Sequence, residues 1–99
     1  PTCILYPDDV SAIGGINEIR ERCLRIPEDI SIAGYDGISI AKIIEPKLTT
    51  LCQDTQTIGR MAAEKLIDLI EQPKTTLIDK YTVDGTLFQG GSVKELRCR

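Results

Sequence analysis

The chain has 99 residues, 27% of them charged, with a net charge of -3 and no histidine. Without histidine, the chain itself cannot support Ser-His or Cys-His catalysis or imidazole metal ligation. The acidic balance argues against direct contact with nucleic acid, and no apolar run approaches the roughly 18 residues of a membrane span. The length suits at most one ordinary domain, and because the chain starts at Pro1 without Met, we expect a piece of a longer protein.

Two short apolar segments are predicted to be strands. Residues 2–6 run into the segment 7–9 with its two acids, and residues 30–36 end in Asp36. Runs of β-branched and small apolar residues favour parallel strands that are covered on both faces. Both predicted strands therefore end in acidic side chains.

A helix is predicted after each of these strands. Apolar residues at spacings of three and four predict a helix over residues 9–24 with Asp8 as its N-cap, and a shorter helix over 39–45 stops at Pro46. The order strand, helix, strand, helix is typical of a right-handed parallel α/β unit. We therefore predict an α/β fold, a parallel sheet with flanking helices.

The second half begins with a predicted extended segment, residues 47–54. The clearest helix of the sequence follows over residues 55–72, with one apolar stripe and a proline just past its end. Residues 75–83 are rich in β-forming side chains and predict another strand, after which Asp84-Gly85 turns the chain. The final polar residues are predicted to be loose.

The acids at the two strand ends suggest a ligand site. Ligands of open parallel sheets bind outside the carboxyl ends of the strands. If the strands are neighbours, about 4.8 Å apart, Asp8 and Asp36 share one rim of a cleft, where paired carboxylates suit a ligand rich in hydroxyl donors. Each Asp could instead serve only as a helix N-cap. A Mg²⁺ site is a weaker alternative because no phosphate-binding glycine loop accompanies the pair, so we predict no metal.

The four cysteines, Cys3, Cys23, Cys52 and Cys98, contain no C-x-x-C pair and fall in different predicted elements. We interpret them as reduced and mostly buried small hydrophobic residues, which favours a cytoplasmic setting, with two disulfides as the alternative.

The motifs DDVSAIG, LRIPEDISIAGYD, PKLTT and IGRMAAEKL occur in this order along the chain. With them, the chain resembles the C-terminal third of LacI/GalR-type transcriptional regulators up to about Leu87. The resemblance implies part of a two-lobed, periplasmic-binding-protein-like type I fold. Residues 1–52 would be a βαβα segment of the C-terminal lobe, residues 53–88 the hinge crossing with a helix and a strand returning to the N-terminal lobe, and residues 89–99 a tail.

The resemblance also assigns roles to residues. Asp8 and Asp36 match positions that hydrogen-bond the effector, although Asp8 stands where the family more often has Asn. Gln53 matches a polar position beside the hinge, which makes it a third ligand-binding candidate.

Three isoleucines match positions in the family's dimer interface. Ile13, Ile16 and Ile44 are therefore dimer candidates, while internal core is the alternative for each of them.

The leading hypothesis is an effector-sensing segment of a cytoplasmic, dimeric transcriptional regulator, without enzymatic activity and without a cofactor. It would bind a neutral sugar or related polyol, and an N-terminal helix-turn-helix outside this segment would bind operator DNA. A periplasmic sugar-binding protein of a transporter is the alternative, and an enzyme on a flavodoxin-like fold is third. As an isolated piece, the chain is expected to expose apolar surface and to pair with another copy.

Overall fold

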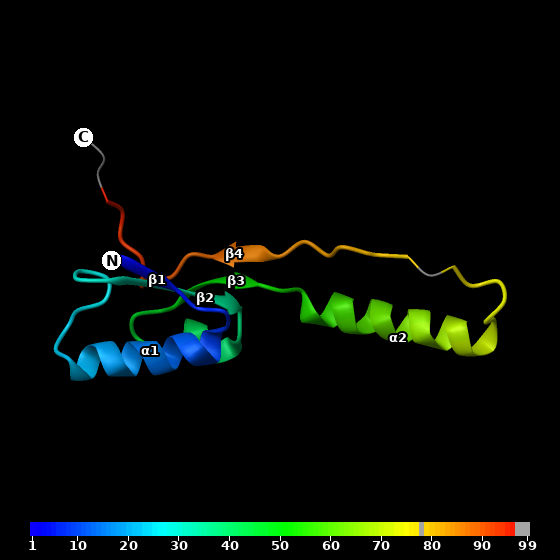
Figure 1. Cartoon of the computed structure of the whole chain (residues 1–99), viewed down its shortest axis with the longest axis horizontal. Coiled ribbons are helices and arrows are strands. Elements are labelled where there is room, and N and C mark those ends of the chain that lie inside the picture. Colours follow the sequence, from blue (N-terminus) through cyan, green and yellow to red (C-terminus); the bar gives the residue numbers. More distant parts are fainter. Residues whose placement is uncertain (78, 97–99) are drawn as a thin grey trace. The chain divides into compact units, whose positions relative to one another are not determined.

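The computed structural model of the protein describes residues 1–77 and 79–96 (Figure 1). Its elements alternate between strands and helices, and the predicted α/β class is confirmed. In chain order they are β1 (Cys3–Leu5), α1 (Asp9–Glu21), β2 (Ser31–Asp36), the 3-10 helix η1 (Ser39–Lys42), β3 (Thr49–Cys52), α2 (Thr55–Glu71) and β4 (Thr86–Phe88). None of the helices in the described residues is long and apolar enough to cross a membrane.

The four strands form one sheet in the order β1-β2-β3-β4. β1 pairs parallel with β2, and β2 pairs parallel with β3, so the first two strands are parallel neighbours as predicted. Leu5 lies opposite Ala33, and Asp36 lies opposite Cys52. β4 runs antiparallel to β3. The carboxyl ends of β1, β2 and β3 therefore share one edge of the sheet.

α1 lies along one face of the sheet (Figure 1), and the core contains buried residues from both. The residues buried there are apolar and come from α1, β2, η1 and the segment before β3. They are Ala12, Ile16, Ile19, Ile32, Ala41 and Leu48. The spacing of the α1 residues places them on the same side of the helix, which explains why the apolar stripe in the sequence folds against the sheet.

α1 ends at Glu21, three residues earlier than predicted. Cys23 adopts a positive φ of 61°, its N–H donates to Arg20 O, and the N–H of Leu24 donates to Ile19 O. This pair of hydrogen bonds is a Schellman C-cap, in which a left-handed residue terminates the helix. The prediction failed at this end because the left-handed position is occupied by Cys and not by the usual Gly.

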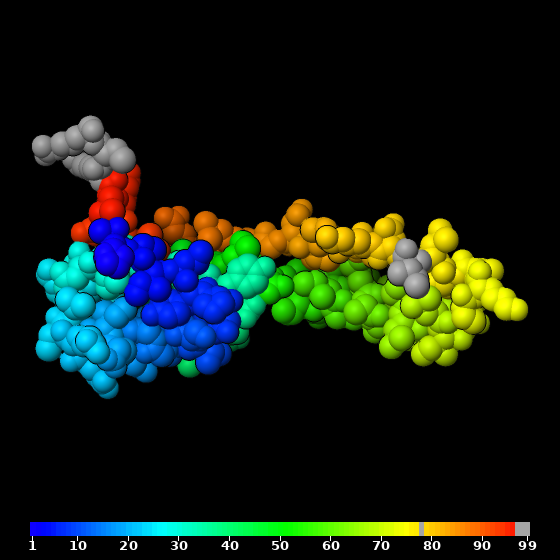
Figure 2. Space-filling model, viewed as in Figure 1, coloured from blue at the N-terminus to red at the C-terminus, as the bar shows by residue number. Residues whose placement is uncertain are grey.

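Residues 90–94 are hydrogen-bonded into the fold, so the prediction of a loose end is wrong for them. Ser92 is 0% exposed and lies between β2 and β3, where its Oγ donates to Ile32 O and accepts from Thr49 N. Lys94 N donates to Ser31 Oγ, also in β2. Figure 2 shows the red end of the chain beside the dark-blue N-terminal residues.

The chain divides into two compact units. The first contains residues 1–52 and 86–99, and the second contains residues 53–85. The predicted strand over 75–83 is wrong for the residues described there, 75–77 and 79–83, which form no strand, and residue 78 lies outside the described residues. Residues with β-forming side chains need a neighbouring strand to form a strand themselves. In this part of the described chain Thr86–Phe88 pairs with β3, whereas the described residues of 75–83 pair with no strand.

In the second unit, none of the 17 residues of α2 is buried. Its apolar stripe is instead exposed at Ile58, Leu66 and Ile70.

Candidate functional site

Asp8 lies at the junction between β1 and α1. It is the N-cap of α1, and its Oδ1 accepts a hydrogen bond of 2.7 Å from Ser11 N. The capping role predicted from the sequence is therefore confirmed. Hydrogen bonds from Ser11, first of all the one from its backbone N–H, hold the pKa of Asp8 below its ordinary value. The half-buried carboxylate is consequently ionised at neutral pH and can only accept hydrogen bonds.

Asp36 is the last residue of β2 and has a left-handed backbone conformation. Its φ is +117°, and the φ of the following Gly37 is +75°. A residue with a side chain pays about 1–3 kcal/mol for such a conformation, and strain of this kind concentrates at functional sites. The half-buried Asp36 thus combines a carboxylate, a strand end and a strained backbone.

The sheet brings the two candidates to the same edge. Asp8 follows β1, Asp36 ends β2, and the two strands are parallel neighbours. Neighbouring strands lie about 4.8 Å apart, so the two acids approach the edge from adjacent positions. This edge is also where open α/β sheets bind their ligands.

Asp9, which the sequence reasoning did not single out, is the most buried acid at this edge. It is 1% exposed, and its Oδ2 accepts hydrogen bonds of 2.9 Å from both Gly37 N and Ile38 N. Its Oδ1 accepts a hydrogen bond of 2.7 Å from Thr50 Oγ1. The sequence did contain a signal for a buried role of Asp9. It is the second of two consecutive acids after a strand, and its position falls on the inner side of the predicted helix.

An apolar hollow of about 400 Å³ lies near the same ends of β1 and β2. Leu5, Tyr6, Pro7 and Tyr35 line it. Leu5 is 76% exposed and Tyr35 is 40% exposed. The residues directly before Asp8 and Asp36 therefore present carbon-rich surface next to the acidic edge.

Gln53 directly follows Cys52, the residue opposite Asp36 in the sheet. It is half-buried and is the first residue of the second unit. Its predicted ligand contact stays a prediction.

The three dimer candidates have different surroundings. Ile16 is 3% exposed and belongs to the core, which is the alternative that the sequence allowed, and it offers almost no surface to a partner. Ile13 and Ile44 are half-buried, and Ile44 packs against the core. The prediction of a dimer contact is retained for these two residues.

The cysteines within the described residues are free. Cys3 and Cys23 are exposed and Cys52 is half-buried, so the prediction of mostly buried side chains is wrong for the first two. β1 is an edge strand of this sheet, and Cys23 lies in the C-cap of α1, which explains their exposure. Cys98 lies outside the described residues. Within the described part of the chain, no group of His, Cys, Asp and Glu side chains could hold a metal ion.

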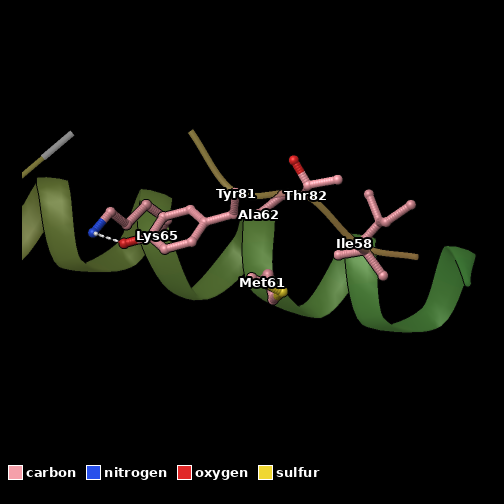
Figure 3. A pocket seen from close by; sticks show the side chains of 7 residues that line it. Ile58, Met61, Ala62, Lys65, Tyr81 and Thr82 are labelled. Atoms are coloured by element: carbon pink, nitrogen blue, oxygen red, sulfur yellow. Dashed lines mark hydrogen bonds between the residues drawn. The ribbon is translucent and has the colours of Figure 1, made fainter. Parts of the chain in front are cut away.

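A second hollow, of about 440 Å³, lies within the second unit (Figure 3). It is lined mainly by carbon, from Ile58, Met61, Ala62, Lys65, Tyr81, Thr82 and Val83. Lys65 Nζ lies 3.5 Å from Tyr81 Oη and 5.5 Å from the centre of its ring. This hollow contains no carboxylate, and the acidic edge of the first unit is therefore the better candidate for hydroxyl recognition.

Comparison with known proteins defines the class of this fold. The family of periplasmic binding protein-like domains matches residues 1–93. The chain belongs to this family, and its relatives of known structure or function include LacI-type transcriptional regulators.

Individual relatives agree with this assignment. The ribose operon repressor of Haemophilus influenzae (strain ATCC 51907 / DSM 11121 / KW20 / Rd) is 40% identical over 73 residues, which cover 74% of this chain and 22% of the repressor. The HTH-type transcriptional repressor PurR of Haemophilus influenzae (strain PittGG) is 43% identical over 70 residues, covering 71% of this chain and 21% of that protein. Both relatives are transcriptional repressors and not enzymes.

A solved structure shows the same architecture. The LacI family transcriptional regulator from Enterococcus faecalis V583, solved with bound ribose, superposes with a TM-score of 0.90 at 31% identity, over 97% of this chain and 36% of that one. The chain thus spans 21–22% of the two repressors and 36% of this structure.

Proposed function

We propose that this chain is the effector-sensing segment of a LacI-type transcriptional regulator, and that Asp8 and Asp36 bind a small neutral sugar or related polyol. The observation that carries the proposal is the parallel pairing of β1 with β2, because it directs both acids to one edge of the sheet. The ribose bound in the Enterococcus faecalis structure supports a hydroxyl-rich effector.

The chemistry of the edge fits such a ligand. An ionised carboxylate offers about four lone-pair positions, and a hydrogen bond from a sugar hydroxyl to a carboxylate is stronger than one between neutral groups. A ligand without hydroxyl donors would cover the carboxylate oxygens without giving them new hydrogen bonds in place of water, which discriminates against it. An anionic effector would need Arg or Lys from outside this chain.

We further propose that the chain crosses between two lobes beside Gln53 and that residues 53–85 belong to the N-terminal lobe. The division of the chain after Cys52 supports this assignment. The strand at residues 86–88, which was predicted to return to that lobe, pairs instead with β3 in the first unit. An effector would shift the regulator toward one conformational state through its differential affinity for the two states. A homodimer, with Ile13 and Ile44 in its interface, would transmit the change to a DNA-binding headpiece outside this chain, in the cytoplasm. The repressor relatives favour this function over a sugar-binding protein of a transporter.

The proposal is tested by calorimetric titration of the intact regulator with ribose, other neutral sugars and nucleosides. A hydrogen bond to a charged group contributes about 1.5–3 kcal/mol, so Asp36→Asn should weaken binding of the recognised compound by about tenfold or more, and Asp8→Asn should change the preference among compounds. Asp29→Asn is the matched control because Asp29 pairs with Arg25 in the loop before β2. Unchanged affinities for both site variants would refute the proposal.

A further inference from the structure

We propose that Asp9 is a positioning residue, which holds the turn at residues 36–38 in its left-handed conformation and thereby presents the Asp36 carboxylate at the edge of the sheet. This inference rests on the proposed function for the role of Asp36 itself. It concerns a second acid that faces inward and touches no effector.

The contacts of Asp9 join three elements. Asp9 is in the first turn of α1, Gly37 and Ile38 follow β2, and Thr50 is in β3. Both Asp9 oxygens are used, Oδ2 by the N–H groups of Gly37 and Ile38 at 2.9 Å and Oδ1 by the Thr50 hydroxyl at 2.7 Å. Asp9 and Thr50 are each 1% exposed. A buried carboxylate with this set of donors is a strong anchor, because charge-assisted hydrogen bonds in a low dielectric resist rearrangement.

The anchored N–H groups directly follow the strained residue. Asp36 has φ +117°, a conformation that persists only when the surrounding structure enforces it. The two N–H groups bound by Asp9 are those of the next two residues, so their positions determine where the peptide after Asp36 lies.

Two glycines make room for this arrangement. A Cβ on Gly34 would collide with Asp9 Oδ1, and a Cβ on Gly37 would lie 2.5 Å from Cys52 Cα. Gly37 also has a φ of +75°, which glycine adopts without steric cost. The turn is therefore confined by β3 on one side and fixed by Asp9 on the other.

The first test needs no effector. At a left-handed position Gly is favoured over Ala, so the folding equilibrium constant of Asp36→Gly should be about tenfold larger than that of Asp36→Ala. In the Asp9→Asn background, where the turn can relax, this ratio should shrink toward one. An undiminished ratio would show that Asp9 does not hold residue 36 and would overturn the inference.

A local measurement covers the case in which a double variant fails to fold. Amide hydrogen exchange at Gly37 and Ile38 should accelerate at least about tenfold in Asp9→Asn relative to the unmodified chain. Ile32→Val is the matched control, because it weakens the core on the same strand without touching the turn. Equal acceleration in both variants would mean that Asp9 has only a general structural role, which contradicts the inference.

Ribose titration of the intact regulator separates this inference from the proposed function. If both hold, Asp9→Asn weakens ribose binding about tenfold and Ile32→Val leaves it unchanged. Loss of binding in Ile32→Val to the same extent as in Asp9→Asn would count against a positioning role. Failure of ribose to bind the unmodified protein would count against a ribose effector. The ratio of the folding equilibrium constants of Asp36→Gly and Asp36→Ala would still decide the role of Asp9.

Discussion

Ser92 offers a direct measure of how much the C-terminal residues contribute to stability. Its hydroxyl donates to Ile32 O at 2.5 Å and accepts from Thr49 N at 2.9 Å, and the residue is fully buried. Ser92→Ala removes this hydroxyl and deprives one carbonyl and one N–H of a buried partner. Each such loss costs about 1–3 kcal/mol, so we expect the free energy of unfolding to fall by about 2–6 kcal/mol in total.

The measurement is urea unfolding of the chain and the variant at a common m-value. For a domain of this size, the expected loss corresponds to a Tm lower by roughly 10–30 °C. Ser39→Ala is the control because Ser39 is exposed in η1. If Ser92→Ala changed the free energy of unfolding by less than about 0.5 kcal/mol, as an ordinary surface substitution does, the reasoning would be refuted.

Two further predictions concern acid stability and self-association. The hydrogen bonds from Ser11 lower the pKa of Asp8 in the folded state, so the stabilisation from this cap is complete above the ordinary Asp pKa and is lost as the pH falls through the lower folded value. The urea midpoint of the unmodified chain should therefore decrease between about pH 7 and about pH 2. The decrease should be smaller in Asp8→Asn, because Asn caps a helix nearly as well as Asp and does not titrate. An equal decrease of the midpoint in both proteins would contradict this prediction. Light scattering of the isolated chain at high concentration should show self-association that Ile13→Ser weakens and Glu21→Ala does not, whereas a strictly monomeric chain would exclude the predicted pairing.

The sequence predicts an element well when its signals are local. α2 begins at Thr55 as predicted and ends at Glu71, one residue before the predicted end, because its apolar stripe is regular and Asp54 caps it through Thr57 N. The segment 75–83 shows the opposite case, in which strong β propensity produces no strand in the described residues. A strand depends on a partner far away in the sequence, and propensity contains no information about that partner.

The sequence likewise predicted part of the candidate site. Acids at the ends of two apolar runs identify Asp8 and Asp36, and the order of elements predicts that the two strands are neighbours. The capping role of Asp8 was predicted, but the contacts of Asp9 were not, because the sequence does not show which backbone groups the fold brings to its buried carboxylate. Only the fold places one beside Ser11 N and the other beside Gly37 N.

The start of α1 links the two acids of the proposed rim into one unit. Asp8 is the N-cap, with an extended backbone, and Asp9 is the first residue of the helix. The Asp8 carboxylate stays half-buried at the sheet edge, while that of Asp9 enters the interior. Asp8 bonds the first turn of its own helix, and Asp9 bonds the turn that follows Asp36. Because both bonds come from one rigid helix start, the relative position of Asp8 and Asp36 is fixed by α1 as well as by the pairing of β1 with β2. A ligand that bridges the two carboxylates would therefore meet a preorganised pair and would lose little affinity to ordering them.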